Sequence, residues 1–305
     1  MRSPIALASI VVALLGPSDA KVVVAGPGDL ALRLLTAKFA AKSGEAAVYA
    51  GEEQKGLGQR YRRLMYGKDF DGESDAPGNA RVLLDINEFA STLASTEALL
   101  LVCDAAPLAN DALLALLNNS PECKRVVLVS KMGATRASKP GFMGLGGDDW
   151  AVLQGEETVR TEAAARGMSV SVVRVGTLKG GGPGGGTATG NDDGTRSDEE
   201  ALGLTKSFYD SILELDVYLA TSSHDKFTLG AKLSAGDPFD MPNPLVRAAR
   251  KSSFEPNDEE TNRIVAATAV VKAAALERAV DFSVSSVKAD ALPTDDDWEE
   301  MLAQI

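Results

Sequence analysis

Short apolar runs alternate with longer amphipathic stretches over the first part of the chain. The apolar runs predict strands at 21–25, 46–50, 81–86, 98–104, 125–130 and 168–178. The stretches between them predict helices at 31–44, 87–96, 107–120 and 150–167, and a polar helix or loop at 53–67. The strands are apolar at consecutive positions, as strands covered on both faces must be. The pattern therefore predicts an α/β fold, a doubly wound and mostly parallel Rossmann-like sheet in three layers.

This alternation stops at a stretch that is first rich in glycine and then acidic, residues 180–200. Such a composition cannot bury enough apolar surface to order itself, so we expect a flexible surface loop or a lid beside a site. Residues 201–258 give no clear pattern. An alanine-rich helix is then predicted at 260–276, a strand at 279–287 and a terminal helix at 295–305. We expect residues 21–305 to form a single domain, with 201–305 as its substrate- or partner-binding region.

The first 20 residues have the pattern of a signal or targeting segment. Arg2 precedes an apolar stretch, and the segment ends in a helix breaker and the small residues Ser18 and Ala20. The alternative is an apolar strand or helix that remains on the protein. No other stretch of the sequence reaches the length of a membrane span, so we expect none in the mature chain.

Charge and composition exclude several classes of function. A formal charge of −12 and a pI near 4.7 disfavour a nucleic-acid partner and an anionic membrane surface. The two cysteines, Cys103 and Cys123, are predicted to be buried free thiols, because a disulfide framework or zinc site needs more sulfurs. His224 is the one histidine, so no metal site is expected. A Ser-His-Asp triad is not expected either, since no G-x-S-x-G motif occurs.

The turn after the first predicted strand matches G-x-G-x-x-G/A, with the residues Gly26, Pro27, Gly28, Asp29, Leu30 and Ala31. Glycines in such a turn let the backbone approach a diphosphate, which binds at the N-terminus of the following helix. Asp29 opposes this, because its carboxylate competes for the same helix end. The alternative is a strand–helix turn that binds nothing.

An acidic residue near the end of the second predicted strand bears on the choice of cofactor. Glu52 would accept hydrogen bonds from ribose hydroxyls and favour NAD. Lys55 and Arg60 lie close by in sequence and could bind the 2′-phosphate of NADP. The choice between NADP and NAD therefore stays open.

The order of the segments resembles a known family. KVVVAGPGDLALRLL, RVLLDI with NEFASTL, ALLLVCDAAP, RVVLVSKMGA and MSVSVVRVGTLKGGGPGG together resemble the atypical short-chain dehydrogenases/reductases, in the NmrA-like NAD(P)-binding branch. The ending DFSVSSVKADALPTDDDWEEML resembles chloroplast-type members. The resemblance implies that Gly26 to Ala31 hold the diphosphate and that Asp85 and Ile86 lie against the adenine. It further implies that Cys103, Asp104 and Ala105 line the far side of the cofactor and that Ser130 matches the serine ending the fifth strand.

The chain departs from this family at the catalytic pair. Active members use Tyr-x-x-x-Lys, whereas the matching helix here has Trp150 and Gln154, and no Tyr-x-x-x-Lys occurs anywhere in the chain. Tryptophan has no proton of useful acidity, and glutamine carries no charge that could tune one. Ser130, Tyr209 and Tyr218 remain as candidate groups, with nothing in the sequence that positions them as a set.

Three functions follow from these observations. The first is a dinucleotide-binding protein with a regulatory or assembly role, which the resemblance places among factors for photosynthetic complexes with a protein partner. The second is an NAD(P)H-dependent oxidoreductase with a non-standard acid such as Tyr209. The third is a protein-interaction scaffold with an empty site. The N-terminal segment and the resemblance together indicate a plastid reached through a secretory-type signal, with a secreted, endomembrane or cytoplasmic location as the alternative.

Overall fold

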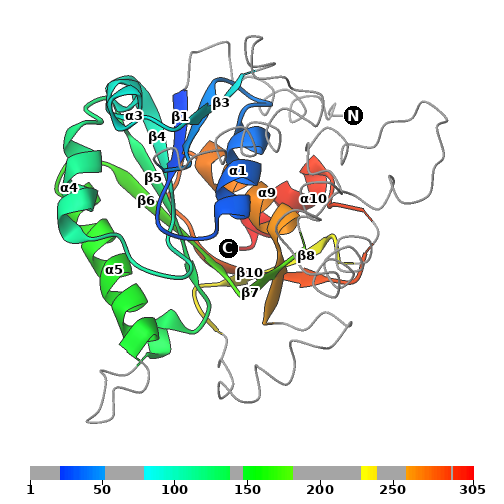
Figure 1. Cartoon of the computed structure of the whole chain (residues 1–305). Helices are drawn as coiled ribbons and strands as arrows, with labels where there is room; N and C mark the ends of the chain where they lie inside the picture. The colour runs from blue at the N-terminus through cyan, green and yellow to red at the C-terminus, as the bar shows by residue number, and fades with distance from the viewer. Residues whose placement is uncertain (1–20, 52–78, 138–146, 181–227, 239–258, 290) are drawn as a thin grey trace, which may run out of the picture.

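The computed structural model describes residues 21–51, 79–137, 147–180, 228–238, 259–289 and 291–305. Its main sheet has eight strands in the order β3-β2-β1-β4-β5-β6-β10-β8 (Figure 1). The strands are β1 (Lys21–Ala25), β2 (Ala46–Tyr49), β3 (Ala80–Leu83), β4 (Thr96–Val102), β5 (Arg125–Lys131), β6 (Ser169–Val175), β8 (Gly230–Ala235) and β10 (Asp281–Val287). All neighbours pair in parallel except β8, which runs antiparallel to β10 at the edge. Strands form at all six places predicted in the first part of the chain, the last with a different end, and the doubly wound fold is confirmed.

Helices cover both faces of this sheet (Figure 1). One layer holds α1 (Leu30–Ala40), α9 (Arg263–Ala275) and α10 (Asp295–Ala303), and the other holds α3 (Ile86–Leu93), α4 (Asn110–Asn118) and α5 (Gly147–Ala164). Consecutive strand residues serve the two layers alternately: Val24 packs in the core with α1 and α9, while Val23 packs in the core with α3 and α4. The three-layer arrangement is therefore confirmed, and it explains why the strands are apolar at consecutive positions.

The predicted strand 168–178 is interrupted at Gly176. A side chain there would place its Cβ 2.1 Å from the backbone oxygen of Glu259, so only glycine fits this close approach. Beyond Gly176 the chain forms β7 (Thr177–Lys179), which pairs with β9 (Glu260–Asn262) in a separate two-stranded sheet. The prediction of one continuous strand was wrong because this pairing is not visible in the local apolar pattern.

The predicted helix 260–276 begins three residues late, because its first residues form β9. Asn262 then caps α9 by accepting a hydrogen bond from the Ile264 amide at 2.8 Å. The terminal helix is confirmed as α10, which begins with a capping box between Thr294 and Asp297. The edge strand β8 had no counterpart in the sequence prediction.

Several predictions fall outside the described residues. They concern the segment 1–20, the cofactor candidates Glu52, Lys55 and Arg60, the glycine-rich stretch beyond Gly180, and the side chains Tyr209, Tyr218 and His224. Within the ranges that the structure describes, no helix has the length and apolar character needed to cross a membrane. Within the same ranges, histidine, cysteine and acidic side chains do not gather into a set that could hold a metal ion.

Candidate functional site

The turn between β1 and α1 lies where the strand order of the sheet reverses, between β1 and β4. Open α/β sheets bind their ligands at this position, outside the carboxyl ends of the strands. Gly26 has a φ of 127°, and a Cβ there would lie 2.2 Å from the backbone oxygen of Val102. The amide of Gly28 donates to that same oxygen at 2.9 Å. The two glycines of the motif therefore hold the turn directly against the end of β4.

Asp29 caps α1 and also forms an ion pair with Arg263, an arginine far away in sequence. Its Oδ1 accepts from the Leu32 amide at 2.7 Å and from Arg263 Nε at 3.0 Å, and its Oδ2 accepts from Arg263 Nη2 at 2.8 Å. Burial alone would raise the pKa of Asp29, but the charge and hydrogen bonds of Arg263, with the Leu32 amide, bring it below its usual value. The carboxylate of Asp29 therefore occupies the N-terminus of α1, and its competition with a diphosphate stays a prediction.

A second carboxylate, Asp104, lies against the same turn. Its Oδ1 accepts from the Asp29 amide at 3.0 Å, and a Cβ on Gly28 would lie 2.2 Å from that oxygen. Burial raises the pKa of Asp104, and the nearby charge of Asp29 raises it further against the opposing hydrogen bond from the Asp29 amide. The position that would receive a diphosphate thus holds two acidic side chains, with Arg263 bound to one of them.

The residues implied to contact adenine follow β3, at the same edge of the sheet. Asp85 caps α3, accepting from the amides of Asn87 and Glu88 at 2.8 and 2.9 Å. Ile86 is 47% exposed, and it is the one large hydrophobic side chain among the described residues that is exposed. An apolar side chain in that place is available for an aromatic base.

Cys103 and Ala105, both implied to line the far side of the cofactor, differ in their exposure to solvent. Cys103 is buried, and burial raises the pKa of its thiol to about 12, whereas Ala105 is exposed. Cys103 lines a small cavity between β4, β5 and α5, together with Leu128, Ser130, Val152, Glu156 and Val159. Both cysteines are free and buried, as predicted from the sequence.

Ser130, the candidate catalytic group, is held inside a buried ion-paired network. It is fully buried on β5, and its hydroxyl donates to Glu156 Oε1 on α5. Glu156 also accepts from Arg174 of β6, with Nε to Oε1 at 3.1 Å and Nη2 to Oε2 at 2.6 Å. The side chains of Glu156 and Arg174 are 3% and 2% exposed. The hydroxyl of Ser130 is therefore engaged with a buried carboxylate.

Arg174 links this carboxylate to two others. Its Nη1 donates to Asp281 of β10, which also accepts from Arg160 of α5. Its Nε lies 4.0 Å from Asp237 Oδ2. Burial alone would lower the pKa of Arg174, but the hydrogen bonds and charges of Glu156 and Asp281 raise it above the usual value.

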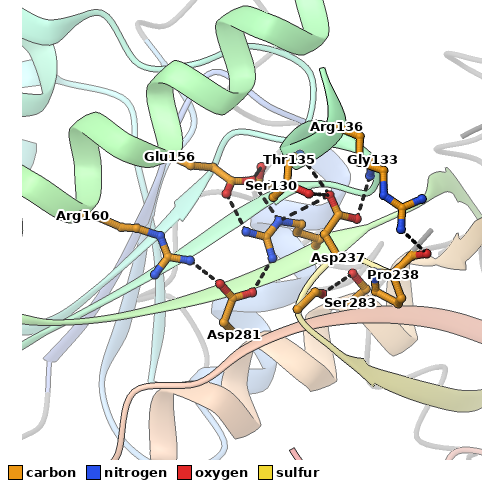
Figure 2. Close-up of polar contacts among 12 residues, drawn as sticks. Ser130, Gly133, Thr135, Arg136, Glu156, Arg160, Asp237, Pro238, Asp281 and Ser283 are labelled. Atoms are coloured by element: carbon orange, nitrogen blue, oxygen red, sulfur yellow. Dashed lines mark hydrogen bonds and ion pairs between the residues drawn. The ribbon is translucent and has the colours of Figure 1, made fainter. Parts of the chain in front are cut away.

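Asp237 in turn fastens the segment after β8 onto the turn after β5 (Figure 2). Its Oδ1 accepts from the Gly133 amide at 2.8 Å, and its Oδ2 accepts from the amide and the hydroxyl of Thr135 at 3.0 and 2.8 Å. Arg136 adds a hydrogen bond to the backbone oxygen of Pro238 at 2.6 Å. Backbone from the second part of the chain thus covers the end of β5.

The two residues at the positions of the Tyr-x-x-x-Lys pair lie on α5 outside this network. Trp150 is half-buried and Gln154 is exposed. Neither supplies a titratable proton. Glu156, the α5 side chain that contacts Ser130, is ion-paired, and Asp149 of α5 pairs with Lys131. The structure therefore brings Ser130 and Cys103 to one cavity and the glycine turn, Asp29 and Asp104 to another place on the sheet edge.

Sequence reasoning missed the residues that decide the chemistry of both places: Glu156, Arg174, Asp237, Asp281 and Arg263. One signal was present. Arg174 stands within the otherwise uncharged run 168–178, and a charge inside a buried strand requires a buried partner. Nothing comparable marks Arg263, which lies 234 residues from Asp29 in sequence.

The strand order and the layers define a Rossmann-like α/β protein. Solved structures similar to it include a short-chain dehydrogenase/reductase of the wide type from Veillonella parvula in complex with NADP, with 11% identity over 90% of this chain and 99% of the other and a TM-score of 0.47. Another is a UDP-N-acetylglucosamine 4-epimerase from Methanobrevibacter ruminantium, with 11% identity over 89% and 79% and a TM-score of 0.45. A third is a UDP-glucuronic acid 4-epimerase variant from Bacillus cereus in complex with NAD, with 12% identity over 52% and 57% and a TM-score of 0.37.

These likenesses are distant, so the fold class rests on the strand order itself. No protein-family model matches the chain, and no curated protein matches it in sequence. The strand order shows a Rossmann-like α/β fold, and the family resemblance read from the sequence stays a prediction.

Proposed function

We propose that this chain is a non-catalytic protein with the short-chain dehydrogenase/reductase fold that binds a nicotinamide dinucleotide and has a regulatory or assembly role. One observation carries the non-catalytic part. Ser130 is fully buried and donates to Glu156, which is ion-paired to Arg174. A carbonyl reductase needs a proton donor that reaches the substrate, and this arrangement removes the serine from that task.

The binding part is supported by the edge of the sheet between β1 and β4. The glycine turn there is tight, Ile86 presents an apolar surface after β3, and the cation Arg263 stands at the N-terminus of α1. The glycine turn would lie against the diphosphate, Ile86 against the adenine, and Arg263 would pair with the phosphate charge. The carboxylates of Asp29 and Asp104 oppose the binding of that diphosphate. A bound reduced nicotinamide would supply a hydride, and the accompanying proton would have to come from a group other than Ser130, whose hydroxyl donates to Glu156.

The test is a fluorescence titration of the full chain with NADPH and with NADH, followed by a turnover assay with aldehydes, ketones and enones. We expect saturable binding of at least one nucleotide and no turnover. A substitution at Gly28 is unsuited to test the site, because any Cβ there would collide with Asp104 and Val102 and disturb the fold. Ile86→Asn changes an exposed side chain and should weaken binding.

A matched control is Ala303→Asn, which changes an exposed residue of α10, the helix that contacts the opposite edge strand β8. This variant should bind like the wild type. Absence of binding to either nucleotide would contradict the proposal and leave the interaction scaffold. Turnover that is lost in Tyr209→Phe would favour the oxidoreductase instead.

The plastid location and the assembly role are further parts of this proposal. They are supported by the resemblance of the C-terminal segment to chloroplast-type members and by the signal-like residues 1–20. A fluorescent protein fused to residues 1–20, expressed in an alga whose plastid is reached through the secretory route, should reach that plastid. Accumulation outside it would remove the support for a photosynthetic partner.

A further inference from the structure

The carboxylate of Asp29 has the contacts that a phosphate takes at a helix N-terminus. One oxygen accepts a helix amide, from Leu32 at 2.7 Å, and both oxygens accept from the guanidinium of Arg263 at 3.0 and 2.8 Å. A helix amide combined with a two-pronged arginine is the donor set that binds phosphate oxygens in proteins. Here it is satisfied by a side chain of the protein itself.

Other donors of the same turn are also engaged within the protein. The Gly28 amide donates to Val102, the Asp29 amide donates to Asp104, and Pro27 has no amide hydrogen. A diphosphate that approaches this helix end therefore meets two carboxylates and a cation already bound to one of them. The positive charge of Arg263 is thus already neutralised by the carboxylate of Asp29.

We infer that Asp29 is an intramolecular competitor of the dinucleotide, so that the diphosphate binds by taking the place of the Asp29 carboxylate on Arg263. This inference rests on the proposed binding function and adds the residue that sets its affinity. The side chains of Asp29 and Arg263 are each 22% exposed, so water can solvate the Asp29 carboxylate when a phosphate replaces it on Arg263.

Arg263 is held in place independently of Asp29. Its Nη1 donates to the backbone oxygen of Gly180 at 2.8 Å, at the end of β7. The first turn of α9, where Arg263 stands, is further fixed by the Asn262 cap. Removal of the Asp29 charge should therefore leave the guanidinium near the N-terminus of α1, with donors available to a diphosphate.

The variant that tests this is Asp29→Asn. The amide oxygen can still accept from Leu32, so the helix cap remains, while the charge that holds Arg263 is gone. In a titration of the full chain with NADPH and NADH, we expect the variant to bind about tenfold more tightly than the wild type. A thermal melt and far-UV circular dichroism establish that each variant is folded.

Two further variants separate this mechanism from a general effect of charge. Asp295→Asn removes one negative charge at the start of α10, where Asp295 pairs with Lys272, and should leave the affinity unchanged. In an Arg263→Gln background, Asp29→Asn should give no gain, because the cation for which the two anions compete is absent. A gain that appears in Asp295→Asn, or that persists without Arg263, would overturn the inference.

The titration also distinguishes failure of the inference from failure of the proposed function. Saturable binding that is equal in the wild type and Asp29→Asn would overturn the inference and leave dinucleotide binding in place. Binding in Asp29→Asn alone would support the inference and overturn the proposed function of the wild-type protein, since the wild-type site would then be closed by its own carboxylate. Absence of binding in both proteins would overturn the proposed function and the inference with it.

Discussion

Arg174 Nη2 donates to Glu156 Oε2 at 2.6 Å, and both side chains are almost completely buried between the sheet and α5. This pair occupies the place next to Ser130, where the resemblance to dehydrogenases leads one to expect acid–base chemistry. Buried charges of this kind are costly to desolvate, and they persist when each partner is fully hydrogen-bonded. The network therefore holds β5, β6, β10 and α5 together next to Ser130.

Removal of the cation should destabilise the protein strongly. Arg174→Met leaves Glu156 buried without its ion pair, and breaking a buried pair in this way costs about 3–5 kcal/mol. Urea unfolding monitored by circular dichroism measures the loss. Arg166→Met is the control, because its contacts, the i,i+4 pair with Glu162 and the hydrogen bonds to Asn118, are solvent-exposed. Such exposed contacts contribute about 1 kcal/mol or less. Equal losses in the two variants would show that the Glu156–Arg174 pair has no special weight.

Ser130→Ala should behave as a structural substitution. It removes one hydrogen bond to Glu156, while the two bonds from Arg174 remain. We expect a loss of about 1–2 kcal/mol in the free energy of unfolding and an unchanged affinity for NADPH or NADH. The same titration used for the wild type measures the affinity. A large loss of binding with normal stability would place Ser130 in the ligand site, contrary to its burial against Glu156.

Asp104→Asn should stabilise the protein at neutral pH. The pKa of Asp104 is raised in the folded state, by burial first and by the charge of Asp29 next. A carboxyl with a raised pKa opposes folding when ionised, and this cost is complete above its folded pKa and absent below its ordinary pKa. The variant should therefore be more stable than the wild type at pH 7, with the difference shrinking as the pH falls towards 4. Urea midpoints between pH 4 and 8 test this, and a constant difference would contradict it.

Lys38 should give the protein a stability that rises with pH. Burial, followed by the charge of Lys42, lowers the pKa of Lys38 from 10.5 to about 7. Between these values the unfolded chain binds more protons than the folded one, so the free energy of unfolding increases as the pH rises from about 7 to about 10. Lys38→Met should remove this increase, whereas Lys124→Met, at an exposed position before β5, should retain it. An unchanged slope in Lys38→Met would exclude Lys38 as its source.

Much of the fold could be predicted because it follows from local patterns. The consecutive apolar residues of β4 and β5 and the glycine turn at Gly26 each depend on neighbours in sequence. The capping of α10 by Thr294 and Asp297 is local in the same way. The break at Gly176 was missed because the reason for it, the close approach of Glu259, comes from a residue more than eighty positions away.

The sequence was sufficient to predict the backbone turn of the candidate site. It was not sufficient to predict which charged side chains pair there. The sequence located the turn, the carboxylate of Asp29 at the start of α1 and the absence of a Tyr-x-x-x-Lys pair. It could not indicate that Arg263 binds Asp29 or that Ser130 donates to Glu156, because these partners come from separate elements. Whether a serine faces a substrate or a buried carboxylate depends on what the rest of the chain packs against it.

The sequence by itself thus determined the alternation of strands and helices, the parallel covered sheet and the glycine turn, since hydrophobic periodicity and turn chemistry act over a few residues. Only the tertiary structure decided which charges meet. Arg174 joins Glu156 of α5, Asp281 of β10 and Asp237 of the segment after β8, and Arg263 binds Asp29 across 234 residues of sequence. Coulomb interactions depend on distance in space, and that distance is set by the path of the chain through the whole sheet.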